Sequence, residues 1–452
     1  MDGDAMQAIT RINISRTLAA ATIVAAGWTG AVGASGGAVA AVGASQSALT
    51  GTGQLVPYPV STIKLRSDEV WARNLSWMSA TGLPKVSLAT VMTDTSYAKT
   101  GTARADTSTS GITNYVTSRS WMENSTDQTS TYYYYPQGLT MTDTNTTGIG
   151  SHDVILGEKG VVSNVDHHSR IAVFDSSTGR YHTVLLVRPT ATGAFGHFAS
   201  HVGGVVQIGN YLYAGDFPAA GAAAQKIAVF DLTKIYAVNA TSSCVTKVGA
   251  VPSVSPPFCG YGERWVLPVM NTYYFQNTDG TTPLPMLDGL GMDNYQQSAP
   301  QLLTMEYCNG APGSTATYPC RVGTDAYSGR VFRFAFDTTV GTDANGFPTY
   351  GKIYQDSAGN LFPSAAWLEN AKACQGIAPS MGAPNSYYMD CNNALVKANP
   401  NTAGAFISSS KWVPANQGCH LDRSTGSGPW LFCAQETAGH KSFWAASVAS
   451  GY

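Results

Sequence analysis

The chain has 452 residues, of which 44% are hydrophobic and 12% are charged, and its formal net charge is -2. A charged fraction about half the usual one, with abundant Gly, Ser, Thr and Ala, is typical of a secreted β-protein rather than a cytosolic helical protein. The small net charge argues against a nucleic-acid partner, which would require a basic face.

Residues 1–45 are predicted to be a signal peptide. Arg11 and Arg16 precede the apolar run Leu18–Ala26, small residues follow it, and Ala38–Ala40 has the small-residue pattern of a cleavage site. A membrane anchor is the alternative, but the apolar run is short and is followed by glycines. We therefore expect a secreted or periplasmic protein that has no membrane attachment after cleavage.

Residues 46–130 are predicted to be a lead-in followed by the first β segments. Val86–Met92 is a strand candidate, and Glu69–Trp77 is compatible with either a short helix or a strand. The Ser/Thr-rich run Thr102–Thr131 has few large apolar residues, which favours a surface loop or an insertion.

Residues 131–452 contain a repeated pattern of short β-rich runs. Ser200–Asp231 contains three such runs separated by Gly, Asn and Asp. Its last hexapeptide, Lys226–Asp231, is nearly identical to Arg170–Asp175, and Arg333–Asp337 is a degenerate third copy. A period of roughly 50 residues with three to four strands per unit is typical of a β-propeller blade.

The predicted fold is therefore all-β, a single β-propeller of about six blades, with five to seven blades left open. The N-terminal segments are expected to complete the ring, and a β-sandwich is the alternative fold. Partial copies of the unit begin at Gln375 and Gln417.

The eight cysteines support export, because they lie between Cys244 and Cys433 at spacings that favour disulfides over a zinc site. Sequence alone leaves their connectivity open. They fall into four local pairs: Cys244 with Cys259, Cys308 with Cys320, Cys374 with Cys391, and Cys419 with Cys433.

Several short segments carry a resemblance to known proteins: Tyr135–Gly138, His201–Gly204 with Tyr211–Tyr213, Lys226–Asp231, Tyr261–Pro268 and Glu306–Cys308. In this order along the chain they resemble a family of secreted bacterial propeller proteins that is common in actinobacteria. The resemblance implies export and a propeller fold, and it implies no particular activity. A more remote similarity, at the level of the fold, is to propeller polysaccharide lyases and glycosidases.

Four polar residues are predicted to surround one mouth of the propeller channel. They are the residues that precede the first strand of a unit, and the three glutamines among them form, together with Tyr135, the predicted substrate-binding set. Alternatively, the glutamines hydrogen-bond neighbouring blades and the histidine is an interior residue with its own partners. The four residues are Gln137, His201, Gln375 and Gln417.

His201, Tyr261, Arg264 and Tyr307 form the predicted catalytic set. An arginine can bind a sugar carboxylate with two hydrogen bonds, and this acidifies the neighbouring carbon–hydrogen bond. A histidine or tyrosine can then remove that proton while a second group protonates the leaving oxygen. This residue set is chemically sufficient for β-elimination from a uronate sugar.

No cofactor is predicted. Asp166, His167 and His168 suggest a divalent metal site, but adjacent histidines on a strand point to opposite faces. Metal binding is therefore the weaker interpretation of this motif.

The sequence favours a carbohydrate-active enzyme, a lyase or a hydrolase, that acts at the channel mouth. The alternative is a non-catalytic propeller that binds a glycan or a protein partner. A polar funnel shared by His201, Tyr261 and Arg264 would favour the enzyme, whereas packing of these residues elsewhere would favour the binding protein. We expect a monomer, and the sequence leaves the substrate and the existence of catalysis open.

Overall fold

The structure is a computed structural model in which Ser47–Tyr452 form one compact unit. The predicted signal peptide, residues 1–45, lies outside the described residues. Within the described part of the chain no helix is long and apolar enough to cross a membrane. The structure describes residues 53–104, 117–129, 133–142, 153–162, 165–216, 225–296, 298–309, 319–322, 328–370, 373–381, 384–391, 394–400, 402–408, 416–423, 429–435 and 442–448.

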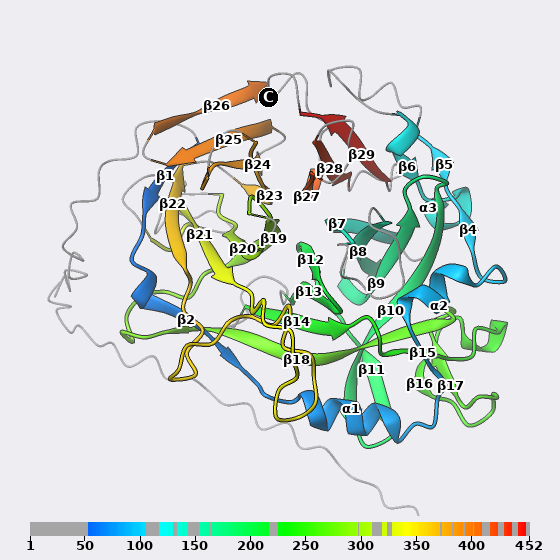
Figure 1. The fold of residues 1–452 in the computed structure, drawn as a ribbon. Coiled ribbons are helices and arrows are strands. Elements are labelled where there is room, and N and C mark those ends of the chain that lie inside the picture. Colours follow the sequence, from blue (N-terminus) through cyan, green and yellow to red (C-terminus); the bar gives the residue numbers. More distant parts are fainter. Residues whose placement is uncertain are drawn as a thin grey trace, which may run out of the picture. The chain divides into compact units, whose positions relative to one another are not determined.

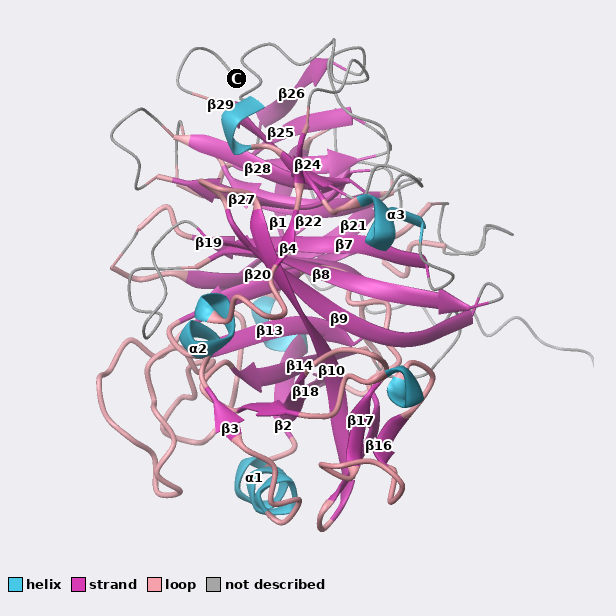
Figure 2. Ribbon diagram, turned by 90° about the vertical axis from the view of Figure 1, so that its right-hand side faces the viewer, coloured by secondary structure: helices cyan, strands magenta, loops and turns pink. Residues whose placement is uncertain are grey.

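The predicted all-β class is confirmed, because strands dominate the described residues and the helices are short. Figure 2 shows α1, α2 and α3 at the outside of the strands. These helices are α1 (Trp71–Ser79), α2 (Leu88–Thr93) and α3 (Ser125–Thr129), and three 3-10 turns are η1 (Val60–Thr62), η3 (Thr117–Arg119) and η4 (Ser242–Cys244).

The strand predicted at Val86–Met92 is wrong for most of its length, because α2 occupies it. The Ser87 side chain accepts a hydrogen bond from the Thr90 backbone N–H and caps the helix. Leu88 and Val91, which lie three residues apart, are buried on one face of this helix.

The described strands form four hydrogen-bonded sheets. The two largest each divide at one parallel strand pair, and with the five-stranded sheet they give five groups built mainly from antiparallel neighbours. The first group is β7 (Tyr133–Met141), β8 (Asp153–Val162), β9 (Val165–Asp175) and β10 (Arg180–Ala191), with β4 (Lys99–Thr100) and β11 (Ala194–His197) on β10. The second is β12 (Val205–Ile208), β13 (Tyr211–Asp216), β14 (Lys226–Asp231), β18 (Trp265–Asn277) and β2 (Ile63–Ser67). Shorter strands β15 (Ile235–Ala237) and β3 (Lys85–Val86) extend it, and β16 (Val248–Ala250) pairs with β17 (Phe258–Gly260).

The remaining three groups follow the same plan. The third is β19 (Leu287–Asp293), β20 (Gln301–Glu306), β21 (Ser328–Ala335), β22 (Ala365–Asn370) and β1 (Gln54–Pro57). The fourth is β23 (Cys374–Pro379), β24 (Tyr387–Cys391), β25 (Ala394–Pro400) and β26 (Thr402–Ser408). The fifth is β27 (Asn416–Asp422), β28 (Trp430–Gln435), β29 (Ser442–Ser447), β6 (Trp121–Met122) and β5 (Thr102–Ala103).

The first strands of the five groups contact one another in a closed cycle, in the order β7, β12, β19, β23, β27 and back to β7. Figure 1 shows these strands gathered at the centre, with the later strands of each group farther out. The repeated hexapeptides lie on β9 and β14, and the degenerate copy overlaps β21 and the residues after it, so the repeat marks the third strand of successive groups.

Apolar residues fill the spaces between neighbouring groups. Because successive side chains of a strand point to opposite faces, each strand supplies two different cores. On β8, Ile155 packs toward the second group, whereas Val154 and Leu156 pack toward the fifth. On β20, Leu302 packs toward the second group and Leu303 toward the fourth. The fourth and fifth groups share a further core.

Segments from the N-terminal part add edge strands to four groups. β4 lies beside β10 of the first group, β2 beside β18 of the second, β1 beside β22 of the third, and β6 beside β29 of the fifth. The buried Arg104 side chain donates to Ser442 Oγ at 3.0 Å and to Gln435 Oε1. The N-terminal and C-terminal parts of the compact unit are therefore joined within one sheet.

All four disulfides lie within single strand groups and join the local pairs that the cysteine spacing suggests. Cys374 and Cys391 face each other on β23 and β24, and Cys419 and Cys433 do so on β27 and β28. Cys244–Cys259 joins η4 to β17, and Cys308–Cys320 follows β20.

Candidate functional site

Five glycines from the first strands, or from just before them, pack closely around the centre of the cycle. A Cβ atom on Gly138 would lie 2.4 Å from the Gly204 Cα, and a Cβ on Gly204 would lie 2.2 Å from the Leu290 N. Such distances leave no room for any side chain. We call Gly138, Gly204, Gly289, Gly376 and Gly418 the axial glycines.

A polar residue precedes four of these glycines, and in three of the four strands the register of the strand pairing shifts at that residue. The shift lies between Pro136 and Gly138 on β7, between Leu287 and Gly289 on β19, and between Cys374 and Gly376 on β23, whereas on β27 it lies one residue later, between Gln417 and Cys419. A bulge changes the direction of a side chain. The polar residues at this step are Gln137, Asp288, Gln375 and Gln417.

Five residues form the candidate site, which we call the axial cluster: Tyr135, Lys159, His201, Asp288 and Gln375. The Lys159 Nζ lies 3.4 Å from both ring nitrogens of His201 and 5.9 Å from the centre of the Tyr135 ring. The His201 Nε2 lies 3.9 Å from the Asp288 Oδ1, and the Gln375 Nε2 lies 3.4 Å from the Asp288 Oδ2. The cluster joins residues from the first four groups.

The axial cluster places an imidazole between a cation and a carboxylate, and these groups reach solvent. The His201 side chain is 29% exposed and the Asp288 side chain is 15% exposed. An ammonium donates hydrogen bonds only, so Lys159 requires a lone pair on the His201 ring. The Asp288 Oδ1, 3.9 Å from the His201 Nε2, is at the separation of an ion pair and not of a hydrogen bond. If an anionic ligand drew the Lys159 ammonium away, the lone pair on the ring could accept a proton from that ligand.

The structure brings together part of the predicted set. His201, Tyr135 and Gln375 lie in the axial cluster. Gln137 lies at the matching step of β7 but is fully buried, and its Nε2 donates to the Pro136 carbonyl at 3.0 Å. Gln417 lies at this step of β27, and its side chain is outside the described part of the structure.

Sequence reasoning missed Asp288 and Lys159. The dipeptide Asp288-Gly289 stands where the other units have Gln-Gly, so the general pattern of a polar residue followed by glycine would have identified Asp288. Lys159 lies on the second strand of its group and belongs to no repeated motif. Only its pairing opposite Tyr135 brings it to the axis.

Tyr261 lies away from the axial cluster, in a packed aromatic group. Its ring centre is 4.1 Å from that of His168 and 5.8 Å from that of His197, and the residue is 9% exposed. His168 also contacts the Tyr134 ring, at 5.0 Å. Among the described residues no group of three or more His, Cys, Asp or Glu side chains has the arrangement of a metal site.

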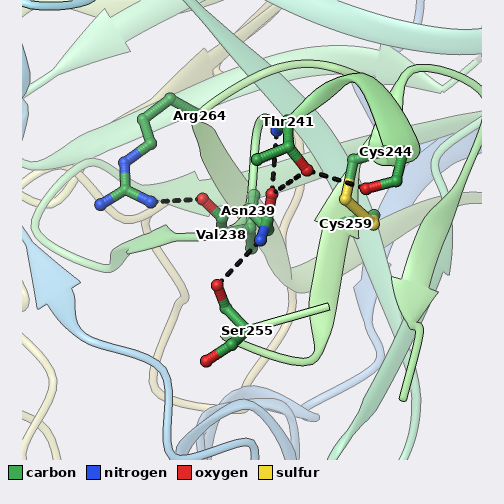
Figure 3. The surroundings of a disulfide bond; sticks show 8 residues. Val238, Asn239, Thr241, Cys244, Ser255, Cys259 and Arg264 are labelled. Carbon is green, nitrogen blue, oxygen red and sulfur yellow. Dashed lines mark hydrogen bonds between the residues drawn. A yellow bond between two sulfur atoms is a disulfide. The ribbon is translucent and has the colours of Figure 1, made fainter. Parts of the chain in front are cut away.

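Arg264 also lies away from the axial cluster, beside the Cys244–Cys259 disulfide. Its guanidinium donates to the Val238 carbonyl and lies over the rings of Tyr97 and Trp265, at 5.5 and 5.3 Å. Figure 3 shows the Arg264 guanidinium directed at Val238. The described contacts of Arg264 are therefore with Val238, Tyr97 and Trp265 and not with the axial cluster.

Tyr307 lies nearer to the axial cluster. Its backbone N–H donates to the Met286 carbonyl at 2.8 Å, so it stands at the same end of β19 as Asp288. The residue is half-buried.

The tyrosine run before Gln137 enters a strand rather than a loop, because β7 begins at Tyr133. Tyr134 is buried, and its ring lies 3.7 Å from the guanidinium carbon of Arg170. Burial raises the pKa of the Tyr134 hydroxyl well above its usual range. Tyr135 is half-buried and contacts Lys159.

Arg170 is the centre of a second charged cluster, on the opposite face of the first group. Glu158 and Lys159 are adjacent on β8, so their side chains point to opposite faces. The Arg170 guanidinium lies 2.6 Å from a Glu158 oxygen and 2.7 Å from a Glu123 oxygen. We define the Arg170 cluster as Arg170, Glu123, Asp127, Glu158 and Glu263, since Asp127 and Glu263 oxygens lie 3.5 and 3.1 Å from Arg170.

No protein-family model and no curated protein matches this sequence. Among solved structures, the GH43_1 enzyme from Xanthomonas citri complexed with xylose is 12% identical, covers 72% of this chain and is itself covered to 91%, with a TM-score of 0.31. CoXyl43, a GH43 beta-xylosidase/alpha-arabinofuranosidase from a compost microbial metagenome, is 11% identical with coverages of 72% and 92% and a TM-score of 0.28. Scores this low support no argument about fold or activity.

Proposed function

We propose that the five strand groups are the blades of a single five-bladed β-propeller. The closed cycle of first strands supports this proposal, and so do the apolar cores between neighbouring groups. The pairing of β6 with β29 would close the ring between the N-terminal and C-terminal parts. A radial arrangement of this kind leaves only short outer edges exposed.

We further propose that the axial cluster binds an acidic saccharide. The observation that carries this proposal is the convergence of Lys159, His201 and Asp288 at one end of the axis. The Lys159 ammonium supplies a charge for a sugar carboxylate, and the Gln375 amide supplies hydrogen bonds to hydroxyls. The Tyr135 ring offers an apolar face for the sugar ring.

The reaction that this cluster can perform is β-elimination. Lys159 would neutralise the uronate carboxylate, and a His201 nitrogen would take the proton from the adjacent carbon. The electrons of the broken carbon–hydrogen bond would form a carbon–carbon double bond as the glycosidic carbon–oxygen bond breaks. The leaving oxygen would take a proton from water or from the Tyr135 hydroxyl. Two-carboxylate glycoside hydrolysis fits less well, because Asp288 is the one carboxylate of the axial cluster.

Binding without turnover is the second candidate function. Tyr261 and Arg264 are engaged elsewhere, and this is the arrangement expected of a non-catalytic propeller. The two candidates share the ligand and differ in whether His201 removes a proton.

The test measures binding and turnover separately, on the secreted protein with uronate-containing and neutral oligosaccharides. Calorimetry should show that Lys159→Met weakens uronate binding by at least about tenfold, while the exposed control Lys85→Met leaves it unchanged. Ultraviolet absorbance of the unsaturated product should show turnover that falls about 100-fold or more in His201→Ala.

Each outcome assigns the function. Uronate binding without any unsaturated product establishes the non-catalytic alternative. Equal binding by the parent protein and Lys159→Met, or binding of neutral oligosaccharides only, would contradict the assignment of the axial cluster to acidic saccharides.

A further inference from the structure

A second polar site lies at the other end of β19. A cavity of about 260 Å³ separates residues of the third and fourth groups there. Asp288 stands near the start of β19 and Asp293 at its end, so the cavity is on the order of 15 Å from the axial cluster. The cavity is lined by Asp293, Tyr295, Gln296, Ala299, Gln301, Arg333, Pro384 and Asn385.

Arg333 is held in the cavity wall through one of its three nitrogens. Its Nη1 lies 3.4 Å from the Asp293 Oδ2 and donates to the Asn385 Oδ1, and its guanidinium lies 5.2 Å from the Trp367 ring. The side chain is only 17% exposed. Its Nε has no hydrogen-bond partner among the described residues. The Nε is also buried from solvent, so Nη2 is the donor left for a ligand in the cavity.

The acceptor atoms around the cavity are already used. The Asp293 Oδ1 accepts from the Tyr295 backbone N–H at 3.1 Å, and its Oδ2 accepts from the Tyr387 hydroxyl at 3.1 Å as well as from Arg333. The Gln301 Oε1 accepts from the Ser364 hydroxyl at 2.6 Å. Because the amide oxygens of Gln301 and Asn385 are engaged, these side chains present their NH2 groups as donors.

The local charge is positive. Arg423 donates to the carbonyls of Tyr295 and Ser380 at 3.1 and 3.0 Å, and its guanidinium lies 4.7 Å from the Tyr295 ring. These acceptors carry no charge. Two guanidiniums therefore lie near one carboxylate, Asp293, and a single additional negative charge would balance them.

We propose that this cavity binds one carboxylate group, carried by a molecule or chain end about the size of a monosaccharide. The Arg333 Nη2 would donate a charge-assisted hydrogen bond to one carboxylate oxygen. The amides of Gln301 and Asn385 would donate to further oxygens, and the Tyr295 ring would cover one face of the ligand. A dianion such as phosphate would carry more charge than the site balances. This site is distinct from the axial cluster and does not depend on the function proposed for it.

The test is calorimetric titration of the whole protein with glucuronate, glucose and inorganic phosphate. We expect saturable binding of glucuronate and none of glucose. Arg333→Met should weaken glucuronate binding by at least about tenfold, whereas Arg66→Met, at an arginine whose side chain is 60% exposed, should not change it. Lys159→Met removes any contribution of the axial cluster and should leave this binding in place.

Gln301→Glu is a second variant that tests the same site if Arg333→Met does not fold. The new carboxylate would accept from the Arg333 Nη2, so glucuronate binding should be lost while the melting temperature is unchanged or higher. Arg333→Met and Gln301→Glu are therefore each combined with Lys159→Met, because the axial cluster is itself proposed to bind uronates. Glucuronate binding that survives either substitution in that background overturns the proposal, and so does absence of binding in Lys159→Met alone. Phosphate binding tighter than glucuronate binding would show that the cavity prefers a dianion to a single carboxylate, and would overturn the proposal.

Discussion

Two buried arginines occupy similar places in the first and third strand groups but have different partners. Arg330 on β21 forms two hydrogen bonds to one carboxylate, Glu306 on β20, at 2.7 and 3.0 Å. Arg170 on β9 lies within 3.5 Å of four carboxylates, and Lys99 adds one cation at 3.1 Å from Asp127. The first arrangement is balanced, whereas the second carries an excess of negative charge.

The comparison separates two uses of a buried charge. A matched arginine–glutamate pair fixes the packing of two strands and can be replaced by apolar residues of similar volume. An arginine that holds several carboxylates keeps like charges close together, and every member depends on it. The Arg170 cluster joins β8, β9, the α3 segment and the turn before β18, whereas the Arg330 pair joins β20 and β21 and also contacts the Pro283 carbonyl.

Loss of the arginine should have the largest effect. Arg170→Met leaves three buried carboxylates and the half-buried Glu263 without their common partner, and we expect the free energy of unfolding to fall by more than about 5 kcal/mol. Arg330→Met leaves one carboxylate, and we expect a loss of about 3–5 kcal/mol. Urea denaturation of the two variants measures the difference, and equal losses would contradict it.

Double variants provide the control for these substitutions. Arg330→Met combined with Glu306→Leu should recover most of the stability, because no buried charge is left in that pair. Arg170→Met combined with Glu158→Leu should stay unstable, because three carboxylates are left.

Loss of one carboxylate should destabilise the fold less than loss of the arginine. The ranking of the two clusters should also reverse, with the larger cost at the Arg330 pair. Glu306→Gln removes the single charged partner of Arg330 and should cost about 3 kcal/mol. Glu158→Gln removes one of four and should cost about 1 kcal/mol, since like-charge repulsion is relieved at the same time. A larger loss in Glu158→Gln than in Glu306→Gln would show that Glu158 dominates its cluster.

The stability at acid pH should also distinguish the Arg170 cluster. Burial alone would raise the pKa of Asp127, but the charges of Arg170 and Lys99 outweigh burial and hold the pKa well below its ordinary value. A lowered pKa stabilises the fold above the unfolded-state value of about 4, and this stabilisation is lost as the pH falls further. Asp127→Asn should therefore flatten the decrease of the melting temperature below about pH 4. If the melting temperature of Asp127→Asn falls at acid pH as steeply as that of the parent protein, Asp127 does not contribute to the acid sensitivity.

Asp153 should show the reverse dependence and the smallest effect. Burial, followed by the nearby Asp175 carboxylate, raises the pKa of Asp153 to about 7. A raised pKa stabilises the fold below the unfolded-state value, and this stabilisation is lost as the pH rises through 7. Asp153→Asn should raise the free energy of unfolding at about pH 8 by on the order of 1 kcal/mol, with less gain at about pH 4. A gain in the free energy of unfolding that is larger at about pH 4 than at about pH 8 would contradict the expected direction of the pH dependence.

Local patterns in the sequence predicted much of the fold. The all-β class follows from short β-rich runs punctuated by Gly, Asn and Asp, and the hexapeptides beginning at Arg170 and Lys226 mark third strands. The four cysteine pairs lie close in sequence and close in space. Val86–Met92 was misjudged because the Ser87 cap and the spacing of Leu88 and Val91 favour a helix over the β-branched composition.

The candidate site was predicted less completely. Gln375 and His201 were recognised because they precede the first strands of repeated units. Asp288 was overlooked because its unit has Asp-Gly in place of Gln-Gly. Tyr261 and Arg264 were placed at the mouth because they stand at a glycine-flanked entrance, but the turn before β18 directs them toward His168 and Val238.

The sequence by itself indicated most of the strands, the local grouping of the cysteines and three of the polar-glycine steps, because these depend on neighbours along the chain. Only the tertiary structure decided which side chains meet. Glu158 and Lys159 are consecutive, yet the pleat of β8 sends one to Arg170 and the other to His201. Contacts between strand groups depend on register and on packing around the axis, and these are properties of the whole fold that no single segment carries.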